Sequence, residues 1–407
     1  MIDRAARVVE ECRKIATMSE EPGRITRRFL SPPVRDVHTH LSSRMEALGM
    51  AVRVDAAGNL RGVWQPSSTA RRRLLVGSHI DTVPDAGAFD GVLGVVLALE
   101  WVRMARDLTL PIAIEVIAFS EEEGVRFGVP FIGSRAVAGR LDRALLELRD
   151  ANGITLDTAL RDFGMNPEAI SDAAADGSAA GFIEIHIEQG PLLEAEGLSV
   201  AAVTSIVGQT RVILEFIGKA NHAGTTPMRL RYDALATAAQ WITIVEKRAR
   251  ATSDLVATVG KIQVRPNAGN VIPGSVELSL DVRHVRDHER RMAVEELLDA
   301  AQSLADRRGL SVAWTTKMDE PAVPMDERLT SYLADAMEVA GLPVKLMQSG
   351  AGHDAMMMAA RMPTAMLFLR SPGGMSHNPA ESVREEDVEA SLCVGQRFLE
   401  RLAAEVR

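Results

Sequence analysis

Residues 74–94, LLVGSHIDTVPDAGAFDGVLG, constrain the fold most, because they predict a buried strand, a loop and a helix in immediate succession. His79 lies where the predicted strand ends, and Asp90 lies where the helix is expected to begin. Both are metal-ligand residue types, and Asp81 is well placed to hold the His79 imidazole in one tautomer. A βα turn with solvated polar residues explains the same stretch, and helix capping alone explains Asp90. The segment therefore needs support from elsewhere in the chain.

Three further strand patterns also end in residues that can bind a metal ion. These patterns, with the side chains that follow them, are 112–119 with Glu121–Glu123, 182–186 with His186, and 365–370 with His377. Three acidic residues in a row are normally a solvated loop, and a lone histidine in a glycine-rich loop is usually just exposed. At the carboxyl ends of buried strands in an open α/β sheet, however, such side chains lie where ligands bind. Carboxylates crowded there cost free energy unless a cation neutralises them. Four strand ends of this kind predict one metal site.

Imidazoles and carboxylates on separate strand ends suit a pair of divalent ions. We expect two ligand sets that share Asp90 as a bridge, namely His79 with His186 and Glu123 with His377. Positions left open for water are typical of a catalytic site rather than a structural one. Glu122 would then take a proton from the acidified water and pass it to a leaving amine. A ligand set without thiolate suits zinc or manganese, and spacing does not distinguish the two.

The segment between the third and the fourth of these strand ends has a different order of predicted strands and helices. Its strand and helix patterns follow the order βαββαβ, at 211–217, 231–249, 255–264, 275–284, 286–307 and 310–316. This order is the split βαβ unit of a small two-layer domain. The sequence therefore predicts a catalytic domain formed by 1–207 and 322–407, with a second domain, 208–321, inserted into it.

The inserted segment carries polar residues that a simple sheet does not need. His222 follows a strand in the loop 221–227, Asn270 lies in the Gly- and Pro-rich connection 265–274, and Arg283 ends a strand. A turn explains Asn270 equally well, and a solubilising edge charge explains Arg283. The functional interpretation is that Arg283 binds a substrate carboxylate with its guanidinium fork. His222 and Asn270 would polarise or position the carbonyl under attack.

Composition and charge exclude several classes of protein. The chain has 407 residues, more than one core usually serves, and its net charge is −9. No basic run exceeds Arg71–Arg73, which disfavours nucleic acid and anionic membranes as partners. No 18-residue apolar run and no signal-peptide core occur. Cys12 and Cys393 provide no disulfide framework, so we expect a reduced, cytoplasmic setting.

A His-x-His pair, His38 and His40, resembles the metal site of barrel-type amidohydrolases. There the pair ends a strand, where alternate residues share a face. Here it lies in a helical pattern, 33–48, where residues two apart point in very different directions. We therefore expect His38 and His40 to be surface residues of a helix.

In combination, the motifs resemble those of the M20 metallopeptidase-like superfamily in its hydantoinase/carbamoylase branch. The stretches that carry the resemblance are GSHIDTV (77–83), AFDGVLG (88–94), AFSEEEGVRF (118–127), HIEQGP (186–191), GQTR (208–211), NHAGTTPM (221–228), PNAGNVIPG (266–274), SGAGHDAM (349–356) and SHNPAE (376–381). HIEQG and GAGHDA in particular separate this branch from ordinary M20 exopeptidases. The resemblance implies an α/β fold, with a mixed-sheet, zinc-exopeptidase-like catalytic domain and an inserted ferredoxin-like lid and dimerisation domain.

The resemblance also implies roles for particular residues and a quaternary structure. It assigns two divalent ions, zinc or manganese, to His79, Asp90, Glu123, His186 and His377, with Asp90 bridging. It makes Glu122 the general base, supported by Asp81 behind His79. It places five side chains against the substrate: Gln189, Arg211, His222, Asn270 and Arg283. Similar enzymes are homodimers built through the inserted domain, in which His222 can serve the partner's site.

The activity that the resemblance implies is hydrolysis of a ureido C–N bond in a small carboxylated substrate. TRRFLSPP (26–33), AFSEEEGVRF, PNAGNVIPGSVELSLDVRH (266–284) and SGAGHDAM are most similar to allantoate amidohydrolases. N-carbamoyl-L-amino-acid hydrolases and β-ureidopropionases are the alternatives, because their substrates offer the same ureido and carboxylate pair. An M20-type aminopeptidase or dipeptidase is a more distant one. A non-catalytic binding protein that keeps the fold is disfavoured by the complete ligand set.

Overall fold

A computed structural model describes residues 2–67 and 70–404 of the chain. Contacts divide the chain into two compact units, Met1–Thr204 with Pro324–Arg407, and Ser205–Val323. Each unit has its own hydrophobic core. None of the helices in the described ranges combines the length and apolarity that a membrane crossing needs.

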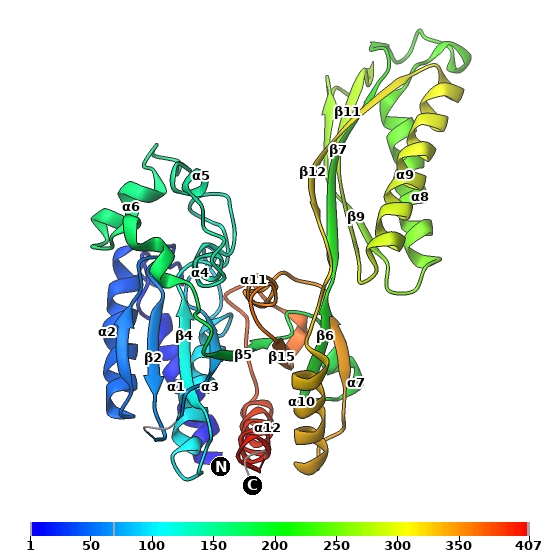
Figure 1. The fold of residues 1–407 in the computed structure, drawn as a ribbon. Coiled ribbons are helices and arrows are strands. Elements are labelled where there is room, and N and C mark those ends of the chain that lie inside the picture. The colour runs from blue at the N-terminus through cyan, green and yellow to red at the C-terminus, as the bar shows by residue number, and fades with distance from the viewer. Residues whose placement is uncertain (1, 68–69, 405–407) are drawn as a thin grey trace. The chain divides into compact units, whose positions relative to one another are not determined.

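The first unit is built on a nine-stranded mixed sheet (Figure 1). Its path runs β1-β2-β4-β3-β5-β15-β6-β13, and β14 pairs with β6. The four central strands, β4, β3, β5 and β15, are parallel to one another, whereas β1, β2 and β6 pair antiparallel. The strands are β1 (Ala51–Val54), β2 (Leu60–Trp64), β3 (Arg73–His79), β4 (Ala113–Phe119), β5 (Ala179–Ile187), β6 (Val200–Ile206), β13 (Val323–Pro324), β14 (Leu346–Ser349) and β15 (Thr364–Leu369).

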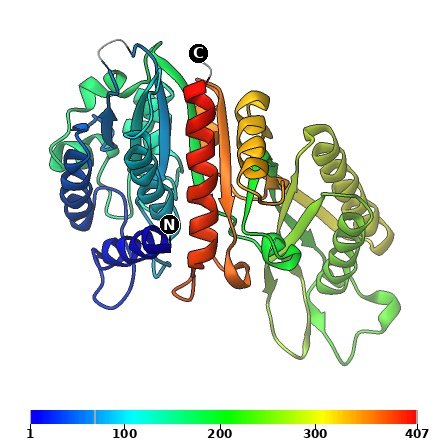
Figure 2. The ribbon, with the colours of Figure 1, turned by 90° about the horizontal axis from the view of Figure 1, so that it is seen from below.

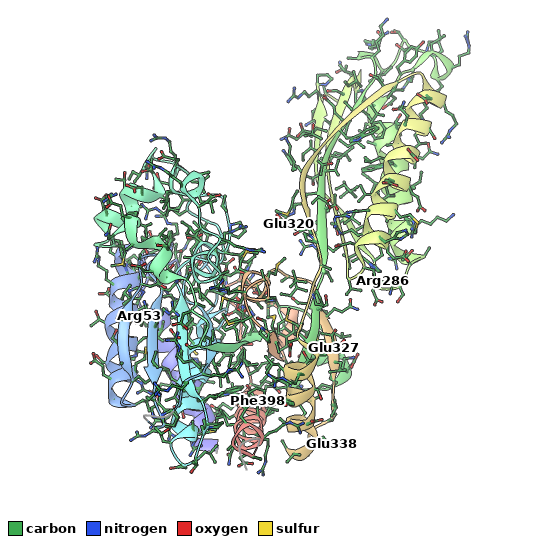
Figure 3. The ribbon with its side chains drawn as sticks, viewed as in Figure 1. Arg53, Arg286, Glu320, Glu327, Glu338 and Phe398 are labelled. Atoms are coloured by element: carbon green, nitrogen blue, oxygen red, sulfur yellow. The ribbon has the colours of Figure 1, made fainter. Side chains whose placement is uncertain are left out.

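Helices pack on this sheet and on one another. Helix α3 contacts β3, β4 and β5, and α1 and α12 pack against α3, with α12 running along β15 (Figure 2). Phe398 of α12, labelled in Figure 3, is fully buried against Trp101 of α3 and Tyr332 of α10. The helices of this unit are α1 (Ile2–Ala16), α2 (Pro32–Ala47), α3 (Val92–Ala105), α4 (Ile132–Val137), α5 (Arg143–Leu146), α6 (Leu156–Asp162), η1 (Pro167–Ala173), α7 (Leu192–Glu196), α10 (Glu327–Val339), α11 (Ala355–Met358), η3 (Pro372–Gly374) and α12 (Glu385–Ala404).

The central strands are near-continuous apolar runs, as buried parallel strands are. All seven residues of β4 are buried. Two glycines let backbones approach closely: a Cβ on Gly77 would lie 1.8 Å from the Ile117 carbonyl oxygen, and one on Gly94 would lie 1.9 Å from that of Ile185. Gly94 thus lets helix α3 lie tightly against β5, and Gly77 lets β3 lie close to β4.

The capping interpretation of Asp90 is wrong. Helix α3 begins at Val92, and its N-cap residue is Gly91, with φ +67° and no side-chain capping bond. A positive φ is a conformation that glycine adopts readily. Gly91 therefore takes the N-cap position for which Asp90 was a candidate. The Asp90 carboxylate is thus available for other contacts.

The second unit is a four-stranded antiparallel sheet with the order β12-β7-β11-β9. Helices α8 and α9 cover one face of it (Figure 1). Alternate residues of β7, such as Leu214 and Phe216, are buried beneath the helices with Trp241. The predicted α/β fold class, with a βαββαβ domain, is confirmed. Its elements are β7 (Gly208–Ile217), β8 (Asn221–His222), η2 (Met228–Leu230), α8 (Ala234–Arg250), β9 (Val256–Arg265), β10 (Val271–Ile272), β11 (Ser275–His284), α9 (Asp287–Arg308) and β12 (Ser311–Glu320).

The prediction that His38 is a surface residue is wrong. His38 and His40 do lie on a helix, α2, but the His38 ring is buried against Phe163, with ring centroids 5.9 Å apart. Phe163 directly follows α6, so the contact that buries His38 comes from a segment more than 100 residues further along the chain. His40 is half-buried, and its Nε2 lies 2.7 Å from Glu11 Oε1.

Burial of His38 predicts a pH-dependent stability. Burial, aided by the charge of Arg35, lowers the pKa of His38 from 6.5 to about 4. The unfolded chain therefore binds the proton first, so the free energy of unfolding falls as the pH drops from about 6.5 to about 4. The contribution is about 1.4 kcal/mol per pH unit. In urea unfolding of the metal-free protein, His38→Gln should flatten this pH slope, whereas exposed His288→Gln should not. An unchanged slope in His38→Gln would contradict the burial argument.

Candidate metal centre

The ligand-type residues meet at one edge of the first unit's sheet. Strand β3 ends at His79, and β5 carries His186 at its penultimate position. The Glu121–Glu123 run follows β4, and the chain reaches His377 after β15. Because these four strands are parallel neighbours, their carboxyl ends meet at the same edge.

Asp90 lies at the centre of this group and faces imidazoles with both of its oxygens. Oδ1 lies 3.1 Å from His186 Nε2 and 3.8 Å from His79 Nε2. Oδ2 lies 3.2 Å from His377 Nε2, which is itself 3.5 Å from Glu123 Oε2. The structure therefore brings together the five residues predicted as ligands, in two sets that share Asp90.

Hydrogen bonds orient two of the imidazoles. His79 Nδ1 lies 3.0 Å from the Asp81 carbonyl oxygen, and His186 Nδ1 lies 2.8 Å from the Ile187 carbonyl oxygen. A carbonyl only accepts, so each Nδ1 carries the proton of the neutral ring and each Nε2 keeps its lone pair. The two Nε2 atoms lie 3.4 Å apart. Both are therefore oriented as metal ligands require.

Asp81 contacts His79 mainly through its backbone. Its carboxylate Oδ1 lies 3.4 Å from His79 Nδ1, farther than its carbonyl oxygen. The carboxylate instead accepts hydrogen bonds from the backbone N–H groups of Glu122, at 3.0 Å, and Glu123, at 3.1 Å. Asp81 thus joins the loop after β3 to the loop after β4.

Crowded charges shift the pKa values in this group. Burial raises the pKa of Glu122 well above its ordinary value, and the carboxylates of Glu123 and Asp81 raise it further. Burial and the charge of Asp90 raise the pKa of Glu123 to about 7. Burial also raises the pKa of Asp90, but in the metal-free protein protonated His186 and His377 donate hydrogen bonds from Nε2 to Asp90, which outweigh burial and hold that pKa well below the ordinary value.

The donor set fits two divalent cations. In the described ranges, three groups of imidazoles and carboxylates have ligand atoms within 4.8 Å of one another: His79–Asp90–His186, Asp90–Glu123–His377 and His79–Glu122–Glu123. Nitrogen and oxygen donors without thiolate suit zinc or manganese. A cation would also neutralise the carboxylates whose mutual repulsion raises their pKa values.

Gln189 contacts the Asp90 carboxylate. Its backbone has φ +57°, and its Nε2 donates to Asp90 Oδ2 at 3.1 Å and to Ser376 Oγ at 3.0 Å. Gln189 was predicted to contact substrate. In the structure its side-chain amide donates hydrogen bonds to Asp90, a predicted metal ligand, and to Ser376.

The remaining predicted substrate residues lie in the second unit and form two pairs. Asp281 joins Arg211, whose Nε lies 3.0 Å from Oδ2, and Arg283, whose Nε lies 2.9 Å from Oδ1. His222 on β8 and Asn270 belong to adjoining segments, because His222 pairs with Val271.

Backbone contacts fix the tautomer of His222. Its Nδ1 accepts hydrogen bonds from the N–H groups of Gly224 and Thr225, both at 3.1 Å. A nitrogen that accepts carries no proton, so the neutral ring holds its proton on Nε2. His222 can therefore donate from Nε2 but cannot act as a base in that form.

Four residues of the site had no predicted role. Ser376 and Glu381 contact the Asp90 loop, and the buried His353 ring packs 4.6 Å from the His186 ring, beside buried Asp354. All four lie inside the quoted stretches SHNPAE and SGAGHDAM. Membership in these stretches was the only available signal, because local patterns do not reveal contacts between distant segments.

Comparisons with known proteins agree with this geometry. The model of Peptidase family M20/M25/M40 matches residues 75–403. The chain is 36% identical to "Allantoate deiminase" of Arabidopsis thaliana, over 96% of this chain and 81% of that protein. It is 38% identical to "N-carbamoyl-L-amino acid amidohydrolase" of Geobacillus stearothermophilus, over 94% of each. A solved amidase of the hydantoinase/carbamoylase family from Burkholderia multivorans superposes with a TM-score of 0.92 at 31% identity, over 98% of each chain.

Proposed function

We propose a reaction and a substrate from the premise that the chain belongs to peptidase family M20/M25/M40 and, within it, to the metal-dependent amidohydrolases of the hydantoinase/carbamoylase family. The reaction is hydrolysis of a ureido C–N bond in a small carboxylated molecule, and the substrate is allantoate. One water is added, the carbamoyl group is released as ammonia and carbon dioxide, and the nitrogen that carried it stays on the product as an amine. The observation that carries the proposal is the Asp90 carboxylate, whose two oxygens face different imidazoles.

The proposed ligands are His79 and His186 for one cation and Glu123 and His377 for the other, with Asp90 shared. When bound, the cations supply Lewis-acid polarisation and lower the pKa of water toward neutrality. The protein's part is to hold these donors in place: the carbonyls of Asp81 and Ile187 keep two imidazoles in the ligating tautomer.

Glu122 is the proposed proton carrier. It follows the buried strand β4, is 9% exposed, and belongs to a donor group with His79 and Glu123. Burial and neighbouring carboxylates raise the pKa of Glu122, so its carboxylate binds a proton more readily than an exposed one. It takes a proton from the attacking water and delivers it to the leaving nitrogen.

The second unit supplies the proposed substrate contacts. Arg211 and Arg283 both form ion pairs with Asp281, which holds their guanidinium groups near each other as candidates for binding one substrate carboxylate. His222 would donate its Nε2 proton to the carbonyl oxygen as negative charge develops there. Asn270 and Gln189 would position the ureido group.

Allantoate is preferred on the similarity of TRRFLSPP, SGAGHDAM and related stretches to allantoate amidohydrolases. An N-carbamoyl-L-amino acid is the second candidate, because a relative of that printed activity is 38% identical. Ammonia release should be measured with allantoate, N-carbamoyl-L-amino acids and N-carbamoyl-β-alanine, each with Mn²⁺ or Zn²⁺. We expect the highest kcat/KM on allantoate. Turnover of dipeptides with no ammonia from any ureido acid would overturn the proposed reaction.

A homodimer through the inserted unit is also proposed. Strand β9 is an edge of its sheet and exposes Val256 and Ile262, at 57% and 47%. Edges with exposed apolar side chains tend to pair with another chain. Light scattering should give twice the chain mass, and a monomer at micromolar concentration would contradict this.

A further inference from the structure

Glu381 lies behind the proposed metal ligands and holds the backbone on which Asp90 is carried. Its side chain is buried, and Oε1 accepts hydrogen bonds from the N–H groups of Phe89, at 2.9 Å, and Asp90, at 3.0 Å. A Cβ on Gly87 would lie 2.3 Å from the Glu381 Cβ, so the side chain packs directly on bare backbone. One carboxylate thus fixes the short loop that leads to the shared ligand.

Ser376 completes the connection between the Asp90 loop and the His377 loop. Its hydroxyl donates to Asp90 Oδ2 at 2.9 Å and accepts from Gln189 Nε2 at 3.0 Å. It also lies 3.5 Å from Glu381 Oε2. Glu381 thus contacts the backbone of Asp90, and Ser376 contacts its carboxylate. Both residues lie about 290 positions after Asp90 in the chain.

The ligands need such support because their backbones are not held by regular structure. Asp90 lies between Gly87 and Gly91, and Gly91 has φ +67°. His377 has φ +55°, an uncommon conformation for a residue with a side chain, which persists only where the surroundings hold it. Neither residue belongs to a helix or a strand. A ligand carried on such a loop loses more conformational freedom on binding a metal than one that is already fixed.

We propose that Glu381 is a positioning residue for the metal centre: it fixes Asp90 relative to His377 and so raises metal affinity, without binding metal or substrate itself. The inference rests on the proposed two-metal site. Residues that orient metal ligands typically change metal affinity 10- to 100-fold when they are removed, on the order of the effect expected here. The contacts required are hydrogen bonds that Glu381 accepts, so an amide oxygen in its place should largely preserve them.

The test is metal affinity, measured by competition with a chelator on the full-length metal-free protein, with Mn²⁺ and with Zn²⁺. Glu381→Ala should weaken binding of at least one of the two cations by about 10- to 100-fold. Glu381→Gln should stay within a few-fold of the unmodified protein. At saturating metal, Glu381→Ala should recover much of its kcat, because no reacting group has been removed.

Asp326→Ala is the matched control. Asp326 also accepts a backbone hydrogen bond, from Leu329 at the start of α10, and it takes no part in the ligand groups of the described residues. It should lower stability without changing metal affinity. If Glu381→Ala does not fold, Ser376→Ala tests the same connection and should weaken metal binding in the same direction.

Two results would overturn the inference while leaving the proposed function intact. One is unchanged affinity for both cations in Glu381→Ala and Ser376→Ala. The other is a loss in Glu381→Gln as large as in Glu381→Ala, which would make charge the cause instead of hydrogen bonding. If the unmodified protein itself binds neither cation, the proposed function fails, and the inference fails with it.

Discussion

Replacing Glu122 with glutamine is expected to lower kcat by about 10²- to 10⁴-fold while both cations stay bound. The amide has nearly the same shape as the carboxyl group but cannot take a proton from water and return it to the leaving nitrogen. Burial and the carboxylates around Glu122 raise its pKa, which makes its carboxylate a better proton acceptor than an exposed one. The measurement is ammonia release at saturating substrate, with metal content determined on the same sample.

Glu121→Gln is the matched control for this experiment, because the two residues are adjacent in the same acidic run. Glu121 is fully buried, and burial raises its pKa well above the ordinary value, but it belongs to none of the donor groups of the described residues. Exchange of its carboxyl group for an amide of nearly the same shape should leave kcat within a few-fold. Full activity in Glu122→Gln, or an equal loss in Glu121→Gln, would contradict the assignment of Glu122 as the proton carrier.

The convergence of the ligands could be predicted from the sequence because it follows from buried parallel strands. Such strands appear as continuous apolar runs, and their carboxyl ends must meet at one edge. His79 and His186 follow two such runs directly, so their proximity needed no knowledge of loop geometry. The glycine-rich path to His377 is longer; the expectation there came from the strand pattern 365–370 that precedes the loop, and the motif SHNPAE agreed with it.

Contacts made by irregular backbone could not be predicted in the same way. The Asp90 capping interpretation failed because Gly91 adopts positive φ and takes the N-cap position, a choice that no periodic pattern encodes. His38 was misplaced because the residue that covers its ring, Phe163, lies in a distant segment of the chain. The contact of Glu381 with the Asp90 backbone joins two loops, and the Gln189 side chain contacts Asp90, whereas it was expected to contact substrate.

Helix α12, at the C-terminal end of the first unit, was not among the elements predicted from the sequence.

Replacing Asp90 with asparagine is expected to reduce the bound metal from two cations to at most one. Activity should fall by more than about 100-fold, because loss of a residue that only orients a metal ligand already costs about 10- to 100-fold. Asp90 is the only residue shared by the two proposed ligand sets, and both of its oxygens face imidazoles at 3.1–3.2 Å. An amide keeps one oxygen and replaces the other with a donor that cannot ligate. His377→Ala should also leave one cation, because the set with His79 and His186 remains complete.

Metal content after dialysis, measured by mass spectrometry on folded protein, distinguishes these cases. His40→Ala serves as the control: this histidine lies on α2 with its Nε2 on Glu11, outside the donor groups of the described residues, and its loss should leave two cations. Two cations retained in Asp90→Asn would mean that the carboxylate does not bridge. The contacts of Asp90 Oδ1 with His186 and of Oδ2 with His377 would then be hydrogen bonds within the protein and not a sign of two metal sites. The chemistry proposed for Glu122 would lose the acidified water on which it depends.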